Sequence, residues 1–260
     1  MVYQTLEIWR DHRVATLWMN RPQVHNAFNA DVIAELSAAF HELATDDTVR
    51  VVVLAGRGKS FSAGADLNWM KAAGQATVAG NRDDAGRLAR MLRLLAELPK
   101  PTIARVHGAA LGGGLGLAAA CDICVAATGA VFATSEVRLG IAPATISPYV
   151  IRAIGARQAS RYFQTAERMS AARAVELGLA HEAVALEALD AKIAELVQVL
   201  LQGGPCAQAA SKALVRTVAH QPVDDVLVEE TAQLIADLRA TPEAREGLGA
   251  FLEKRPPAWI

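Results

Sequence analysis

Two glycine-rich stretches are the parts of this chain whose residue types and spacing could do chemistry. The first runs from Gly56 to Asp66, and the second contains the triplet Gly112-Gly113-Gly114. Each follows an apolar run and leads into a helix-forming one, so unpaired peptide N–H groups are expected at the positive end of a helix dipole. Two such groups that converge on one oxygen form an oxyanion hole, which stabilises an enolate or a tetrahedral intermediate. Spacing alone also allows both stretches to be simple tight turns.

Glu136 is the best candidate for a catalytic acid or base. It lies in a loop of small residues, outside any helical pattern of charges. A carboxylate placed there can exchange protons with a substrate, although a solvated loop acid would have the same local sequence. His107 stands at the end of a predicted strand, where a packing role is the simpler interpretation.

Strands are predicted before both glycine stretches. Residues 6–9 and 14–19 alternate or run apolar around a turn and indicate a β-hairpin. Residues 49–55 form a continuous β-branched run, which is typical of a strand buried on both faces. Residues 102–106 form the strand before the triplet. Short strands are also expected at 123–127 and 131–133.

Helices are predicted between these strands and, after about residue 185, without them. Asn29-Ala30-Asp31 provides a cap for a helix over 32–43, and a small polar segment at 74–84 predicts a mobile loop before a helix over 86–98. Further helices are expected at 67–72, 115–121, 149–154, 170–177, 186–201, 205–219 and 223–239, with a last one that begins at Thr241-Pro242. We expect an α/β core domain at 1–185, which holds the site, and a helical region at 186–260.

Composition excludes several classes of function. The 260 residues are 52% hydrophobic and 20% charged, with a formal net charge of −1, which argues against nucleic acid or an anionic membrane as a partner. The beginning of the chain shows no secretory signal, no apolar run is long enough to span a membrane, and the three cysteines fit a reducing compartment. We therefore expect a cytoplasmic protein. Cys121-x-x-Cys124 has no second pair, so we expect inert buried thiols and no metal site.

Two nucleotide-binding motifs are excluded by their spacing. Gly58-Lys59-Ser60 resembles the end of a phosphate-binding loop, but the glycine required five residues before Gly58 is Val53. Gly114-x-Gly116-x-x-Ala119 fits a dinucleotide fingerprint. Its candidate acid, Glu136, nevertheless lies beyond two short predicted strands instead of at the end of the next one.

Together these residues resemble the enoyl-CoA hydratase/isomerase, or crotonase, superfamily over nearly the whole chain. The resemblance is carried by Arg21-Pro22, Asn26-Ala27-Phe28, Phe61–Leu67, Lys100–Ala104, the glycine triplet, Cys121-Asp122, Glu136-x-x-Leu139-Gly140 and Phe251–Arg255. It implies a spiral of ββα turns with a helical C-terminal trimerisation region, in a homotrimer or a hexamer built as a dimer of trimers. It also implies an acyl-CoA substrate. Coenzyme A would arrive as part of that substrate, and no separate cofactor is implied.

The resemblance further implies roles for individual residues. The N–H groups of Ala65 and Gly113 would hold the thioester carbonyl oxygen as it becomes an enolate, with Glu136 as the general acid and base. Backbone groups of Ala63 and Leu67 would meet the adenine. The C-terminal Lys254 would reach a CoA phosphate, often from a neighbouring subunit. The remaining residues expected to line the substrate or CoA site are Ala27, Asp66, Gly112 and Gly116.

One position departs from the superfamily pattern. Its hydratases use two glutamates, one two residues after the glycine triplet and the other twenty residues later; here the second is Glu136 but the first is Gly116. Glu136 alone could move a proton between C2 and C4, as in the Δ3,Δ2-enoyl-CoA isomerases. Hydration could instead use help from another group, or Gly116 could make room for a branched substrate. The helper candidates are Ser135, His107 and Tyr149. A non-catalytic acyl-CoA-binding protein is a further alternative.

Three segments carry a finer resemblance. Residues 66–70, 135–140 and 143–150 are similar to bacterial 3-methylglutaconyl-CoA and γ-carboxygeranoyl-CoA hydratases, which serve leucine and acyclic-terpene breakdown. We therefore expect hydration or dehydration of a branched or carboxylated enoyl-CoA.

Overall fold

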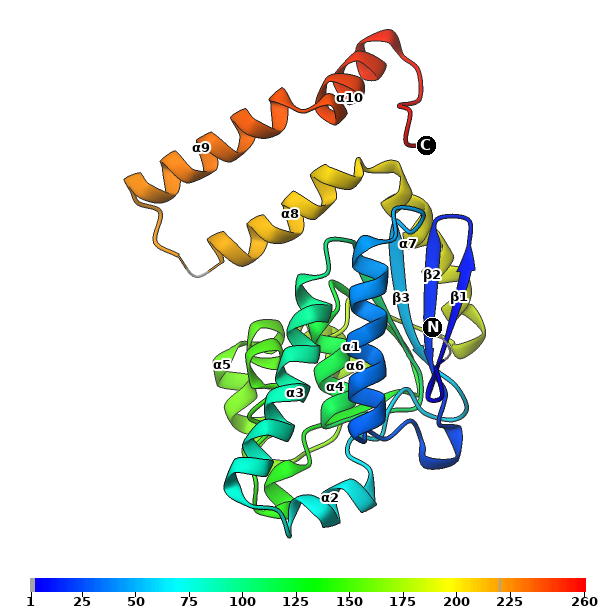
Figure 1. The fold of residues 1–260 in the computed structure, drawn as a ribbon, viewed down its shortest axis with the longest axis vertical. Coiled ribbons are helices and arrows are strands. Elements are labelled where there is room, and N and C mark those ends of the chain that lie inside the picture. Colours follow the sequence, from blue (N-terminus) through cyan, green and yellow to red (C-terminus); the bar gives the residue numbers. More distant parts are fainter. Residues whose placement is uncertain (1–2, 220) are drawn as a thin grey trace.

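A computed structural model describes residues 3–219 and 221–260, in which helices surround two β-sheets (Figure 1). The larger sheet has the order β1-β2-β3-β4-β6-β9. Its first two strands form the predicted antiparallel hairpin, and the other neighbouring pairs are parallel. Parallel strands end at the same edge of a sheet, so the segments that follow β3 and β4 start close together. The strand bounds are β1 (Leu6–Asp11), β2 (Val14–Met19), β3 (Val51–Gly56), β4 (Thr102–Val106), β6 (Ile123–Ala127) and β9 (Glu182–Val184).

The smaller sheet has the order β5-β7-β8, formed by β5 (Ala109–Leu111), β7 (Val131–Ala133) and β8 (Met169–Ser170). Strand β5 is absent from the sequence-based prediction because it is only three residues long and begins only three positions after β4 ends. Gly108 separates the two strands with φ +59°, and a Cβ there would lie 2.0 Å from the carbonyl oxygen of Lys59. Only glycine allows both this backbone conformation and this close approach.

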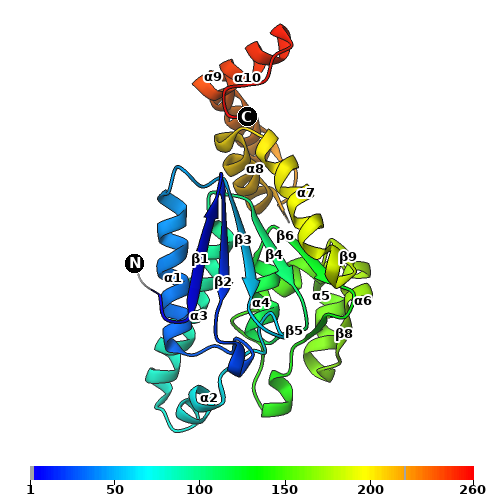
Figure 2. The same ribbon diagram turned by 90° about the vertical axis from the view of Figure 1, so that its right-hand side faces the viewer.

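Helices cover both faces of the larger sheet. Figure 2 shows α1 (Ala30–Thr45) and α3 (Val78–Glu97) on one side and α7 (Leu189–Gln202) on the other. Val52 and Leu54 of β3 join the core formed with the first group, while Val51 and Val53 join the core formed with α7. All of β3 is buried, which confirms the prediction of a strand covered on both faces.

The predicted mobile loop at 74–84 is wrong for most of its length. Helix α2 (Leu67–Ala73) is followed by only a short link, because α3 already begins at Val78. The side chain of Thr77 caps α3 by accepting a hydrogen bond from the N–H of Gly80. Val78 is 87% exposed, and the buried side chains of α3 begin only at Leu88. The first turns therefore carry no apolar periodicity from which a helix could be predicted.

The chain between the smaller sheet and β9 is helical. Helix α4 (Gly113–Ala120) follows β5, and the 3₁₀ helix η2 (Glu136–Leu139) follows β7. Helix α5 (Ser147–Thr165) is longer than the predicted 149–154 because the chain continues through a kink at Gly155, which has φ +75°. Helix α6 (Ala171–Glu176) follows Ser170, whose side chain forms the predicted N-cap.

Helices alone follow β9, in agreement with the predicted change near residue 185. Helix α7 still packs on the sheet, whereas α8 (Pro205–Val218), α9 (Asp225–Ala240) and α10 (Pro242–Glu253) project from the end of the molecule opposite α2 (Figures 1 and 2). Thr241 caps α10 as predicted, with the Ala244 N–H 3.1 Å from its hydroxyl oxygen. Among the described residues, no helix is both long enough and apolar enough to cross a membrane.

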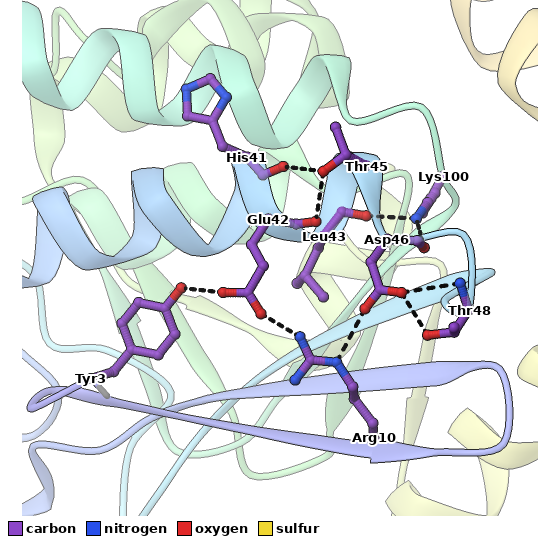
Figure 3. A network of polar contacts seen from close by, with 9 residues as sticks. All are labelled: Tyr3, Arg10, His41, Glu42, Leu43, Thr45, Asp46, Thr48 and Lys100. Atoms are coloured by element: carbon purple, nitrogen blue, oxygen red, sulfur yellow. Dashed lines mark hydrogen bonds and ion pairs between the residues drawn. The ribbon is translucent and has the colours of Figure 1, made fainter. Parts of the chain in front are cut away.

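A polar network fastens the hairpin to α1 and to the segment that enters β4 (Figure 3). Arg10 of β1 donates to Glu42 at 2.5 Å and to Asp46 at 3.2 Å. Lys100 Nζ donates to the carbonyl oxygens of Leu43 and Asp46, at 2.6 and 2.5 Å. Carbonyl groups at a helix C-terminus have no partner within the helix and attract a cation. Lys100 therefore ties β4, and with it the segment that leads to the glycine triplet, to the end of α1.

Candidate active site

The two glycine-rich stretches lie against each other at one edge of the sheet. Ser62 forms a parallel bridge with Ala110, in which the Leu111 N–H donates to the Ser62 carbonyl oxygen at 2.9 Å. A Cβ at Gly64 would lie 3.0 Å from the Leu111 carbonyl oxygen and 3.8 Å from the Cα of Gly112. Glycine at 64, with φ +93°, is thus required for the close approach of the two segments.

The peptide group of Ala65 is turned away from the chain that pairs with it. Phe28 donates its N–H to the Gly64 carbonyl oxygen at 2.7 Å and accepts from the Asp66 N–H at 2.8 Å. Both bonds go to the residues that flank Ala65, so this bridge does not use the Ala65 N–H and C=O groups. The Ala65 N–H is therefore left out of the pairing with Phe28, as a candidate oxyanion donor requires.

The N–H of Gly113 opens helix α4. Gly112 is the N-cap, with φ +50°, and its own N–H donates to the Ala133 carbonyl oxygen at 2.9 Å. As the first helical residue, Gly113 has no acceptor within the helix for its N–H. A Cβ at Gly113 would lie 2.5 Å from the Phe28 ring. Phe28 therefore connects the two candidate donors, because it pairs with Ala65 through its backbone and packs on Gly113 through its ring.

Glu136 is brought to the same place by η2. Its Oε1 lies 3.3 Å from the position that a Cβ at Gly112 would take. Its Oε2 is buried and has no hydrogen-bond partner in the described part of the chain. Burial raises the pKa of the Glu136 carboxyl above its ordinary value. These properties are the opposite of those of a solvated loop acid, and they suit a group that exchanges protons with a bound molecule.

The space beside Gly116 is filled by Ile146. Gly116 lies one turn along α4, with its N–H 3.0 Å from the Gly112 carbonyl oxygen. A Cβ at Gly116 would lie 2.3 Å from Cγ2 and 2.9 Å from Cβ of Ile146, which is only 2% exposed. The expectation that Gly116 makes room for a branched substrate does not fit this packing. Ile146 could not be identified from the sequence because nothing in its local sequence indicates that it packs on α4.

Both carboxylate oxygens of Asp66 accept hydrogen bonds from other groups of the protein. Its Oδ2 accepts from Arg21 Nη2 at 2.9 Å, and its Oδ1 caps α2 by accepting from the Asn68 N–H at 2.9 Å. Burial opposes ionisation, but the hydrogen bond from Arg21 holds the pKa of Asp66 below its usual range. Arg21 also donates to the Ala27 carbonyl oxygen at 2.7 Å. These contacts of Asp66 and Ala27 position the segment that contains Ala65. Both residues were expected to line the substrate or CoA site, whereas the contacts seen for them are with other groups of the protein.

The other expected CoA contacts are divided between the two ends of the chain. Ala63 and the exposed Leu67 lie on either side of Ala65 in the same segment. The Ala63 N–H donates a hydrogen bond to the His25 carbonyl oxygen at 2.9 Å. Lys254 follows α10 directly, and Figure 1 shows α10 at the opposite end of the molecule from α2. Within one chain, therefore, Lys254 is not brought to the site.

Two of the three candidate helpers have other surroundings. His107 Nε2 lies 2.8 Å from the Gly58 carbonyl oxygen. Tyr149 lines a cavity of about 620 Å³ together with Lys212, and the lining of this cavity includes neither Glu136 nor the glycine triplet. Ser135 adjoins Glu136 in the chain. Of the three candidates, Ser135 is thus the one that adjoins the carboxylate in the sequence.

The Cys121-x-x-Cys124 pair consists of two free thiols. Cys124 is buried, and burial raises the pKa of its thiol to about 12. Burial also raises the pKa of the Cys121 thiol. Both are therefore protonated at neutral pH, as expected for inert thiols. Across residues 3–219 and 221–260, no group of three or more His, Cys, Asp or Glu side chains is placed to hold a metal ion.

Comparison with known proteins gives matches over the whole chain. Residues 10–260 match the family model described as Enoyl-CoA hydratase/isomerase. The chain is 34% identical to a crotonyl-CoA hydratase of Syntrophomonas wolfei, over 100% of this chain and 99% of that protein. It is also 34% identical to a 2,3-dehydroadipyl-CoA hydratase of Escherichia coli, over 97% of each.

Solved structures match equally well. A Legionella pneumophila structure described as an enoyl-CoA hydratase/isomerase (crotonase) gives a TM-score of 0.92 at 43% identity, over 98% of this chain and 99% of that one. An enoyl-CoA hydratase from Shewanella pealeana gives a TM-score of 0.96 at 40% identity, over 98% and 96%. These neighbours confirm the crotonase-like α/β fold with a helical C-terminal region that the sequence predicted.

Proposed function

Because the chain belongs to the enoyl-CoA hydratase/isomerase family, we propose that it catalyses the reversible hydration of an enoyl-CoA thioester. The observation that carries the proposal is the position of Glu136. Its Oε2 atom is buried without a partner among the described residues, and its Oε1 atom lies beside Gly112, the residue that precedes Gly113 at the start of α4. A proton-transfer group and an oxyanion donor are thus adjacent.

One carboxylate can complete the reaction. Glu136 takes a proton from water as the water oxygen bonds to C3, and the C2=C3 π electrons move to the thioester carbonyl oxygen. The Ala65 and Gly113 N–H groups stabilise the resulting enolate. Glu136 then returns its proton to C2 as the enolate collapses, so that one water molecule is added in all. The raised pKa of Glu136 suits both steps of the reaction, because the carboxylate must first accept a proton from water and then donate a proton to C2.

The proposed substrate is a branched or carboxylated enoyl-CoA of the 3-methylglutaconyl-CoA type. The resemblance at residues 66–70, 135–140 and 143–150 supports it. The name of the Escherichia coli relative also specifies a carboxylated thioester, whereas that of the Syntrophomonas wolfei relative specifies an unbranched one. We expect a higher kcat/KM for 3-methylglutaconyl-CoA than for crotonyl-CoA, measured by loss of enoyl-thioester absorbance. The reverse order would overturn the finer assignment and keep the hydratase.

Isomerisation is the second candidate, and the packing of Ile146 on Gly116 favours it. The position of a second carboxylate is filled, and moving a proton between C2 and C4 needs only one carboxylate. A 3-enoyl-CoA incubated in heavy water separates the two reactions. A protein that leaves the 3-enoyl-CoA unreacted but converts the 2-enoyl isomer into a 3-hydroxyacyl-CoA supports hydration, whereas double-bond migration without any 3-hydroxyacyl-CoA from either isomer would replace hydration with isomerisation.

We also propose that the chain works as a homotrimer, or as a hexamer of two trimers. Helices α8–α10 project from the body, and α10 exposes Phe251 and Leu252 at 81% and 79%. Lys254 follows these residues and lies far from the site of its own chain. An adjacent subunit would cover the apolar side chains and let Lys254 reach the CoA phosphates of the neighbouring site.

A further inference from the structure

The first turn of α4 has so little space around it that each glycine there faces a different neighbour. A Cβ at Gly112 would approach Glu136, one at Gly113 would meet the Phe28 ring, and one at Gly114 would lie 2.5 Å from the Ser62 carbonyl oxygen. One turn further, a Cβ at Gly116 would collide with Ile146 at 2.3 Å.

Glu136 and Ile146 reach α4 from the same connection, the one between β7 and α5. It leaves β7, places the carboxylate beside Gly112 and returns to place Ile146 on Gly116. The carboxylate thus lies at the N-cap of α4, and the isoleucine lies beside Gly116, four residues further along the chain.

Building on the proposed function, we propose that Ile146 is a specificity-determining residue, which seals the α4 side of the site and confines proton transfer to Glu136. A side chain at 116 would point into space that the buried hydrocarbon of Ile146 occupies, so a second carboxylate has no room there. The glycine and the isoleucine form a matched pair, since a side chain can exist at 116 only if the one at 146 is shortened.

The backbone of Ile146 cannot easily withdraw. Its carbonyl oxygen accepts from the N–H groups of Tyr149 and Val150, at 3.1 and 3.2 Å, and so forms the first turn of α5. Its Cβ and Cγ2 are the atoms in contact, so a rotation of the outer ethyl group does not relieve the collision. Valine at 146 would keep two methyl groups on Cβ, whereas alanine would remove them. Valine is therefore the matched control.

A double-mutant cycle tests the contact without depending on activity. We expect Gly116→Ala to lower the Tm in the wild-type and Ile146→Val backgrounds, and to lower it much less in the Ile146→Ala background. The same decrease in all three backgrounds would show that Ile146 does not exclude a side chain at 116, and would overturn the proposal.

A second comparison tests the consequence for the reaction. We expect Gly116→Glu combined with Ile146→Ala to hydrate crotonyl-CoA faster than Gly116→Gln combined with Ile146→Ala, by roughly 10²-fold, because a general acid–base group contributes on this scale. The glutamine variant has the same shape and no carboxylate, so the ratio isolates the charge. Equal rates in two variants that both bind acyl-CoA would contradict the assignment of this position.

A failure of the proposed function can be distinguished from a failure of the proposal for Ile146. A wild-type protein that neither hydrates nor isomerises any of the enoyl-CoA substrates would contradict the function. The Tm cycle would still show whether Ile146 excludes a side chain at 116, and the glutamate-to-glutamine ratio would still show whether a carboxylate can act from there.

Discussion

Glu136 combines two properties that one residue seldom has on a surface loop. Its Oε2 atom is buried without a hydrogen-bond partner among the described residues, and its Oε1 atom lies beside Gly112, the N-cap of α4. A buried carboxylate oxygen without a hydrogen-bond partner is costly for a folded protein. Such a cost is typical of catalytic groups, which acquire their partner only when substrate binds.

Replacing Glu136 by glutamine should nearly abolish turnover. The amide keeps the size of the side chain but cannot carry the proton, so kcat should fall by roughly 10²–10⁴-fold. Binding of the saturated analogue butyryl-CoA, measured by calorimetry, should persist because the Ala65 and Gly113 donors remain. Turnover close to that of the wild type would rule out Glu136 as the proton carrier.

The same substitution should change the pH dependence of stability. The folded-state pKa of Glu136 lies above the ordinary 4.5, so its stabilising contribution is complete below pH 4.5 and is lost as pH rises through the folded-state pKa. Glutamine does not titrate. The Tm of Glu136→Gln relative to wild type should therefore increase between pH 4 and pH 7. Glu187→Gln, at an exposed site, serves as the control, and a flat difference for Glu136→Gln would contradict the raised pKa.

At the scale of elements, the site depends on short segments fixed to one another. The Ala65 segment is held by Phe28 through its backbone and by Arg21 through Asp66. Asp66 also caps α2, so one carboxylate orients the segment before it and starts the helix after it. An oxyanion donor acts only if it is fixed before the reaction, and these contacts supply that rigidity.

Removing the Asp66 carboxylate should therefore affect both stability and catalysis. Asp66→Ala loses the cap, which costs about 0.5–2 kcal/mol, and it also leaves Arg21 without its carboxylate partner. Asp66→Asn keeps an oxygen for the cap and loses only the charge. Urea unfolding should give the order wild type, Asn, Ala, with kcat falling in the same order. An alanine variant equal to wild type in both would show that the pair does not position Ala65.

At the scale of the whole molecule, the C-terminal helices contrast with the rest of the chain. No residue of α8 or α9 is buried, while α7 completes the core on the outer face of the sheet. Apolar side chains exposed on projecting helices indicate a surface that is covered in an assembly. The proposed trimer would use these helices and bring Lys254 to a neighbouring CoA.

Charge substitutions on α10 should dissociate that assembly. Phe251→Asp combined with Leu252→Asp places two carboxylates where apolar contact is expected, and sedimentation should show loss of the trimer or hexamer. Replacing exposed Glu253 by glutamine serves as the control. A wild-type protein that sediments as a monomer would contradict the proposed assembly.

Lys254→Ala should weaken CoA binding selectively. Loss of a charged contact to a phosphate should raise the Kd of an acyl-CoA by roughly tenfold. The Kd of the matching acyl-pantetheine, which lacks the phosphates, should stay the same. Equal effects on both ligands would place Lys254 outside the phosphate site.

The sequence by itself determined the features that local chemistry encodes. The cap at Asn29, the cap and proline at Thr241-Pro242 and the β-branched run of β3 each favour one structure within a few residues. The glycine triplet and Glu136 were candidates on the same local grounds, and the family resemblance covered nearly the whole chain.

Tertiary structure decided what depends on distant segments meeting in space. Phe28 joins the two candidate donors, Ile146 fills the side of Gly116, and burial raises the pKa of Glu136. None of these contacts leaves a local signal, because each one joins segments that are separated in the chain and brought together only by the packing of sheet and helices. The sequence could show that a carboxylate is missing at 116, but only the packing shows that an isoleucine has taken its place.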